Sequence, residues 1–168
     1  MDFHWIWRRI KSIFYRPKAE LEAMRFETGK MGETYFILLT LCILIGLSKI
    51  KLGISHFISE TLIWFVASLL TTFATWIFVS KFGIKTTWAK SLKINSFAIS
   101  PLLLCVITSE VIGYRMALLI IGFCYSVYLL FYGINMVFNP KDKETFIYTL
   151  CITLIGLLSN YIARVLIP

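Results

Sequence analysis

The feature that most restricts the fold of this chain is a run of twenty-five residues, Met116 to Pro140, without a formal charge. A helix needs roughly 20 apolar residues to cross about 30 Å of hydrocarbon, so this run is long enough to span a bilayer. Unpaired backbone N–H and C=O groups are costly in lipid, and the run is too evenly apolar for a barrel strand. It therefore predicts a transmembrane helix.

Four further uncharged runs have the same character, although the first of them is short. The chain is 58% hydrophobic and has a mean hydropathy of +0.79, whereas a water-soluble domain is roughly 45–50% apolar. We therefore expect an all-α protein, a polytopic membrane bundle of five transmembrane helices that forms one domain over residues 34–168. The expected spans are about 34–52, 61–80, 94–114, 116–138 and 145–166.

The placement of Lys and Arg predicts the orientation of these helices. Seven of the 17 basic residues precede the first span, and alternate segments hold thirteen against four. Because basic residues accumulate on the cytoplasmic side, the N-terminus is predicted to be cytoplasmic and the C-terminus outside, in a cell membrane. This requires an odd number of spans, and five satisfies it. The net charge of +8 follows from this topology, so no nucleic-acid partner is expected.

Residues 1–33 are predicted to be a cytoplasmic interfacial segment. Phe3, Ile6, Trp7 and Ile10 recur at spacings of three and four, which places them on one face of a helix. Because basic residues fall largely on the other face, we expect an amphipathic helix that lies on anionic lipid headgroups. A docking site for a soluble cytoplasmic protein is the alternative. The residues expected to contact the membrane surface are Trp5, Trp7, Arg8, Arg9 and Lys11.

The third predicted span contains polar residues and a proline in an apolar stretch, NSFAISPLLLCV, which starts at Asn95. Pro101 has no N–H and frees a carbonyl near Phe97, which Ser100, Asn95 or water can bond. We favour a kink that lets unequal helices pack. A broken helix that lines a substrate path is the alternative.

Glu110 is the charged residue predicted to lie deepest in the membrane, about a turn inside the outer end of the third span. An intramembrane carboxylate is a functional candidate, although near an interface a structural ion pair is commoner. We expect Arg115 or Arg164 to neutralise it. Asn135 and Asn160 are expected to make hydrogen bonds between helices.

Small residues spaced four apart are expected to let helices pack closely. Gly122 and Ser126 form one such patch, and Gly156 with Asn160 forms another. These patches can join helices within one chain. They can equally join two chains into a homo-oligomer, and the sequence leaves both uses open.

The sequence contains no motif that indicates catalysis or metal binding. The four cysteines lie in predicted spans without a close-spaced pair, and the two histidines, His4 and His56, lie in separate segments. There is no Gly-x-Ser-x-Gly elbow, His-Glu-x-x-His motif or complete phosphate-binding loop. We therefore expect no enzyme activity and no cofactor.

Three features of the sequence recur in a fixed order. A short basic leader contains Arg16-Pro17, the third span contains Ser100-Pro101-Leu102-Leu103, and the fourth contains the aromatic-glycine stretch YLLFYGI, in which the glycine is Gly133. In this order, over most of the chain, the sequence resembles the Yip family of Rab-interacting-type membrane proteins.

The Yip resemblance implies trafficking at the Golgi or endoplasmic reticulum, through prenylated small GTPases, if the chain is eukaryotic. The N-terminal segment here is about thirty residues, shorter than the long soluble region of eukaryotic members. This difference favours a prokaryotic member in the cytoplasmic membrane. We expect a non-enzymatic scaffold or adaptor that presents its N-terminal helix and the loop from Lys81 to Lys93. The alternative is a small transporter, channel or lipid-moving protein that uses the broken third helix.

Overall fold

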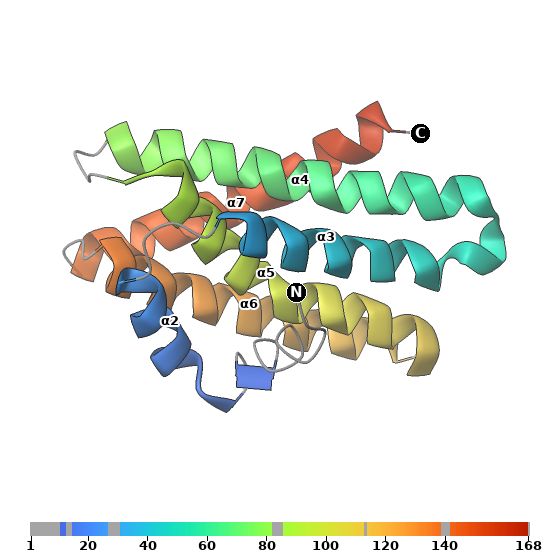
Figure 1. Ribbon diagram of the computed structural model, residues 1–168, viewed down its shortest axis with the longest axis horizontal. Helices are drawn as coiled ribbons and strands as arrows, with labels where there is room; N and C mark the ends of the chain where they lie inside the picture. Colours follow the sequence, from blue (N-terminus) through green and yellow to red (C-terminus); the bar gives the residue numbers. More distant parts are fainter. Residues whose placement is uncertain are drawn as a thin grey trace.

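All regular structure in the described part of the chain is helical (Figure 1). The computed structural model describes residues 11–12, 15–26, 31–81, 86–112, 114–138 and 142–167. Its elements are α2 (Pro17–Phe26), α3 (Met31–Ser48), the 3₁₀ turn η1 (Ile50–Leu52), α4 (Ile54–Lys81), α5 (Trp88–Ile112), α6 (Arg115–Phe138) and α7 (Asp142–Leu166).

Four of the described helices, α4 to α7, are long and apolar enough to cross a membrane. The apolar part of α3 covers only Thr34–Ser48. At 1.5 Å per residue it is about 22 Å long, shorter than the roughly 30 Å of a hydrocarbon core. The described residues therefore form a multi-pass membrane bundle with four full-length candidate spans and one shorter apolar helix.

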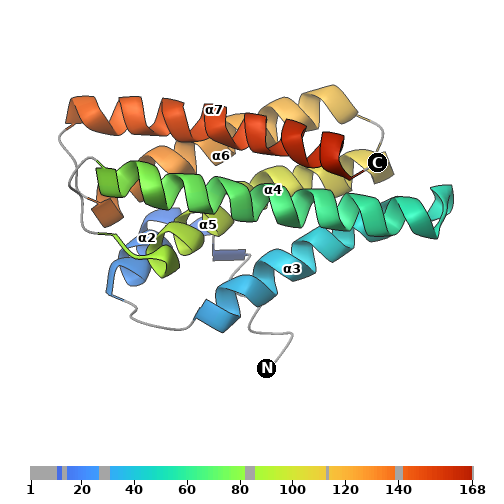
Figure 2. The same cartoon turned by 90° about the horizontal axis from the view of Figure 1, so that it is seen from above.

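Helix α5 lies at the centre of the bundle. Figure 2 shows α4 between α3 and α7, and α5 also contacts α3, α4 and α6. Within its apolar segment α5 is 61% buried, compared with 28% for α6 and α7. Every residue from Ser91 to Ala98 is buried, so neighbouring helices surround this part of α5 on all sides. Protein, rather than lipid, is thus the environment of its polar side chains.

Two glycines allow neighbouring helices to approach closely. A Cβ at Gly46 of α3 would lie 2.6 Å from the carbonyl oxygen of Phe57 in α4. A Cβ at Gly122 of α6 would lie 2.7 Å from the Cβ of Cys105 in α5. Because lipid provides no hydrophobic drive for helices to associate, close backbone packing of this kind is what holds such pairs together.

Helix α5 is continuous through Pro101, as the favoured kink requires, and the alternative of a broken helix is wrong. Figure 1 shows that α5 changes direction along its length, as a proline kink predicts. The hydroxyl of Ser100 donates to the carbonyl oxygen of Ser96 at 2.6 Å. Pro101 itself is buried. The local serine therefore bonds the carbonyl next to the one that proline frees, and the helix bends without opening.

The predicted cytoplasmic loop from Lys81 to Lys93 is also wrong at its C-terminal end. Helix α5 begins at Trp88, six residues before the predicted start of the third span. Lys90 is half-buried and Lys93 is only 7% exposed. The hydropathy pattern placed the start of this helix too late because Lys90 and Lys93 interrupt the apolar run. The helical segment that contains these two lysines nevertheless packs against the bundle.

Helix α2 packs against the C-terminal half of α6. Leu21 of α2 is fully buried, in a core cluster with Ile94 and Ile134. A Cβ at Gly133 would lie 3.1 Å from Cγ2 of Ile94 and 3.4 Å from Cδ2 of Leu21. Gly133 therefore sits where α2, α5 and α6 meet, and a larger side chain there would push them apart.

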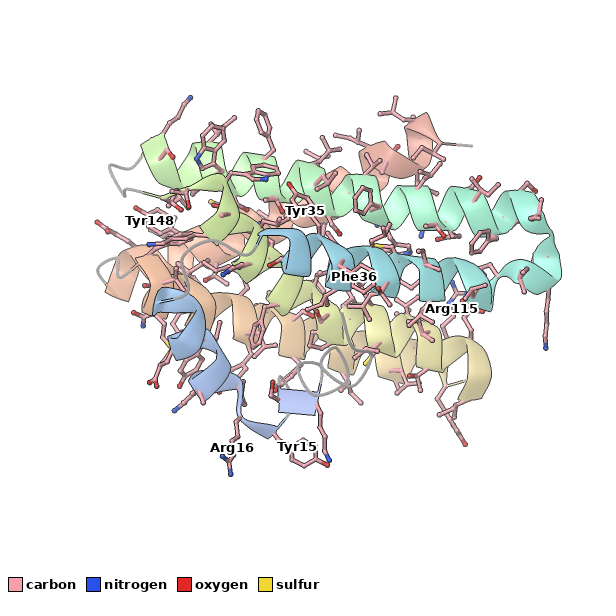
Figure 3. All side chains as sticks on the ribbon, viewed as in Figure 1. Tyr15, Arg16, Tyr35, Phe36, Arg115 and Tyr148 are labelled. Atoms are coloured by element: carbon pink, nitrogen blue, oxygen red, sulfur yellow. The ribbon has the colours of Figure 1, made fainter. Side chains whose placement is uncertain are left out.

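Most of the amphipathic helix predicted before Pro17 lies outside the described residues. This includes four of its five predicted membrane contacts, Trp5, Trp7, Arg8 and Arg9. Lys11 is described and exposed, and its ammonium lies 5.6 Å from the centre of the Tyr15 ring. Figure 3 shows Tyr15 and Arg16 pointing away from the bundle.

Candidate functional site

A cavity of about 210 Å³ lies between α4, α5, α6 and α7, and we call it the four-helix cavity. Most of its wall is apolar. Each of the four helices also contributes a polar side chain to the wall. These are Thr71 of α4, Asn95 of α5, Ser126 of α6 and Asn160 of α7. A mainly apolar wall with a few polar groups is typical of small-molecule sites.

Asn95 is tied into the wall of the cavity by a relay of hydrogen bonds. Its side-chain amide donates to Oγ1 of Thr75 at 3.0 Å, and the Thr75 hydroxyl donates to the carbonyl oxygen of Thr71 at 2.7 Å. The relay joins α5 to α4. Polar contacts between membrane helices average about 0.6 kcal/mol, so this one is a modest structural bond.

Two other polar atoms of the wall have no hydrogen-bond partner among the described residues. They are the hydroxyl oxygen of Ser126 and the amide nitrogen of Asn160, and both atoms are buried. The amide oxygen of Asn160 does have a partner, because Nε of Arg164 donates to it at 3.2 Å. A buried polar group without a partner costs about 1–3 kcal/mol, so these two atoms are suited to bind a ligand.

Two ion pairs lie at the end of the bundle where α3 and α7 terminate, which we call the ion-pair end. The Lys49 ammonium lies 2.6 Å from Oε1 of Glu110. Arg164 binds Glu60, with Nη1 3.1 Å from Oε1. The prediction that Arg115 or Arg164 neutralises Glu110 was therefore wrong.

Lys49 reaches Glu110 because α3 packs beside α5. Arg115, by contrast, is exposed at the start of α6, and Figure 3 shows its side chain near this end of the bundle. The sequence did contain a signal for the ion pair that forms, between Lys49 and Glu110. The predicted topology already placed Lys49 and Glu110 on the same side of the membrane.

The structure does not gather the predicted site residues at one place. Only Asn95 and Asn160 line the four-helix cavity. Pro101 and Glu110 do not line it, and neither does Asn135, which is half-buried on α6. The predicted path past Pro101 and Glu110 therefore does not coincide with the cavity.

Sequence reasoning missed an aromatic cluster at the opposite end of α4. The indole N–H of Trp88 donates to the Tyr35 hydroxyl at 2.7 Å. The rings of Phe73, Trp76 and Trp88 have centroids 6.1 to 6.4 Å apart. Trp and Tyr are enriched at membrane interfaces, so Trp76 and Trp88, which flank the connection between α4 and α5, were the available signal.

No group of three potential metal ligands occurs among the residues that the structure describes. All four cysteines, Cys42, Cys105, Cys124 and Cys151, are free thiols within helices. The described residues therefore offer no built metal centre.

Long apolar helices packed around the central helix α5 define the class of this chain, a multi-pass integral membrane protein of the α-helical type. The sequence profile of the Yip1 domain matches residues 11–162, which is most of the chain, so the chain belongs to the Yip1 family. The predicted resemblance to the Yip family is thus confirmed. Comparison with curated proteins and with solved structures finds no match.

Proposed function

We propose that the chain crosses a cell membrane five times, with its N-terminus in the cytoplasm and its C-terminus outside. Three observations support this topology. Helix α3 lies beside α4, and the C-terminus lies at the same end of the bundle as the connection between α3 and α4 (Figure 1). The basic residues are concentrated in alternate segments. Lys51, which follows α3 and is exposed, can extend its ammonium toward the headgroups and lengthen this short span.

Within that topology the chain acts as a non-enzymatic membrane scaffold or adaptor. The observation that carries this proposal is the docking of α2, in which Leu21 is fully buried beside Gly133. A helix anchored in the core holds its exposed side chains, such as Lys18, at the face that the proposed topology makes cytoplasmic. If the chain is eukaryotic, the membrane is that of the Golgi or endoplasmic reticulum, and the role belongs to trafficking.

The exposed charges just before α2 and at its start are mostly basic, with Glu22 as the acidic exception. Lys11, Arg16 and Lys18 are all exposed, and the Lys18 ammonium lies 5.2 Å from the centre of the Tyr132 ring. Clusters of Lys and Arg beside a membrane attract anionic lipid, at about 1 kcal/mol for each residue near the surface. We propose that these basic residues contact anionic headgroups and an acidic cytoplasmic protein.

Crosslinking in intact cells tests the scaffold proposal. Protein without residues 1–16 is compared with full-length protein and with a Lys51→Gln control, which removes one exposed charge from the connection between α3 and α4. We expect a crosslinked partner that the deletion loses and the control keeps. If the full-length protein recovers no partner, or if the deletion leaves recovery unchanged, the scaffold role is refuted.

The four-helix cavity favours a second candidate, a small transporter, channel or lipid-moving protein. Asn95 places a polar group in its wall at the centre of the bundle. Vesicles with purified protein are compared with empty vesicles for flux of ions and of labelled lipid. Flux that Asn95→Leu reduces would support this candidate, and no flux above empty vesicles would remove it.

A further inference from the structure

The four-helix cavity opens toward lipid. Four of the eight lining residues from α4 and α5 are buried, compared with two of the nine from α6 and α7. Leu157 of α7 lines the cavity and is 53% exposed. Leu154 and Leu158 on the same helix are also exposed. The mouth of the cavity therefore lies on the side of α6 and α7, on an apolar outer surface.

The cavity is elongated along the bundle. Its lining on α7 extends from Ile152 to Asn160, which is about 12 Å at 1.5 Å per residue. Between these levels the wall is mostly aliphatic, with Ile99 and Leu102 from α5 and Val127 from α6. A narrow apolar space of this length fits a segment of hydrocarbon chain.

Two buried polar atoms of the wall have hydrogen-bonding capacity that the described residues leave unused. Asn160 of α7 has an unpartnered amide N–H group, and Ser126 of α6 has an unpartnered hydroxyl. Asn160 lies one turn, about 6 Å, from Arg164 at the ion-pair end. An arginine there lies at headgroup level, so Asn160 lies slightly deeper, where the ester carbonyls of a phospholipid are found.

From these observations we propose that the four-helix cavity binds one acyl chain of a membrane phospholipid. The Asn160 amide donates a hydrogen bond to the ester carbonyl of that chain, and the chain runs inward along Ile99 and Leu102. The bound lipid fills the space between α6 and α7. This site goes beyond the scaffold role and does not depend on it.

Photolabelling of the full chain tests the proposal. The protein is placed in vesicles of phosphatidylethanolamine and phosphatidylglycerol that contain a phospholipid with a diazirine in one acyl chain. Labelled residues are then located by mass spectrometry. We expect label on Ile99 and Leu102, which line the cavity on α5. Label only on outward residues such as Leu158 would overturn the proposal.

Cavity-filling variants provide the matched comparison. Ser126→Leu places bulk in the cavity, whereas Leu158→Phe adds bulk to the exposed surface outside it. We expect Ser126→Leu to reduce labelling of Leu102 at least about tenfold, equivalent to about 1.4 kcal/mol, and Leu158→Phe to leave it unchanged. If Ser126→Leu does not fold, Thr153→Leu fills the cavity from α7. Unchanged labelling in a folded cavity-filling variant would refute the site.

The role of Asn160 is tested by competition with unlabelled lipids. An ether phospholipid lacks the ester carbonyl, so it should compete about fivefold less well than its ester counterpart, as expected for one lost hydrogen bond. In Asn160→Leu the two lipids should compete equally. Equal competition in the unmodified protein would remove the carbonyl contact. Stronger competition by free fatty acid than by phospholipid would overturn the assignment of the ligand.

Discussion

The ammonium of Lys49 lies 2.6 Å from the carboxylate of Glu110, which joins the end of the short helix α3 to the last turns of the central helix α5. Both side chains are mostly shielded, at 16% and 23% exposure. Packing places these residues together, because α3 lies along both α4 and α5. The pair therefore locks the shortest apolar helix to the most buried one.

Glu110→Gln should lower stability, because it leaves the Lys49 ammonium without its carboxylate. We expect a loss of about 1 kcal/mol, since partly exposed ion pairs are worth 0.2–1 kcal/mol and this one is well shielded. For a chain of this size the melting temperature should fall by about 2–4 °C. Thermal unfolding in detergent measures this fall in melting temperature. The exchanged pair Lys49→Glu with Glu110→Lys should recover most of the loss, and no recovery would mean that the contact is not electrostatic.

Gly122→Val should separate α6 from α5. A Cβ at this position would lie 2.7 Å from Cβ of Cys105 and 3.2 Å from Cα of Leu102. Overpacking of this kind typically costs 1–3 kcal/mol. Gly156→Ala is the matched control on α7, because its Cβ would meet Thr71 at an ordinary 3.6 Å. Thermal unfolding should separate the two variants, and equal behaviour would contradict the close approach at Gly122.

Leu21→Ala should loosen α2 from the bundle. Truncation of a buried leucine costs about 2–5 kcal/mol, and here the loss falls on a helix of only ten residues. Limited trypsin digestion should therefore cut at Lys18 faster, while α4 to α7 stay protected. Glu22→Ala is the control, since Glu22 is exposed on the same helix. Equal cleavage of both variants would show that Leu21 does not anchor α2.

The hydrogen bond from Asn95 to Thr75 should appear as a coupling in a double-mutant cycle. Asn95→Leu and Thr75→Val each remove one partner, and the double variant removes both. We expect a coupling of about 0.6 kcal/mol, the average for hydrogen bonds between membrane helices. A coupling near zero would mean that the contact does not contribute to stability.

The sequence predicted well the helices whose surfaces face lipid. Helix α6 was expected at 116–138 and begins at Arg115, because a long uncharged run has few alternative environments. The predicted helix boundary was wrong where neighbouring helices, rather than lipid, surround the chain. The first two turns of α5 contain Lys90 and Lys93, which hydropathy assigns to a loop, yet Lys93 is buried in the bundle.

The candidate site was less accessible to sequence reasoning than the fold. Asn95 and Asn160 could be selected from the sequence as polar residues in apolar runs. That they line one cavity follows only from the packing of the helices. The partner of Glu110 was missed for the same reason. Which charge reaches it depends on the packing of α3 against α5, and hydropathy carries no information about which helices are neighbours.

Cysteine accessibility in intact cells tests the proposed five-span topology most directly. Lys51→Cys and Tyr15→Cys are exposed positions before α4 and before α2, and each is placed in a chain whose four native cysteines are replaced by alanine. A membrane-impermeant maleimide should label position 51 in intact cells and position 15 only after permeabilisation. Labelling of both positions under the same condition would show that α3 does not cross the membrane and would contradict the proposed topology.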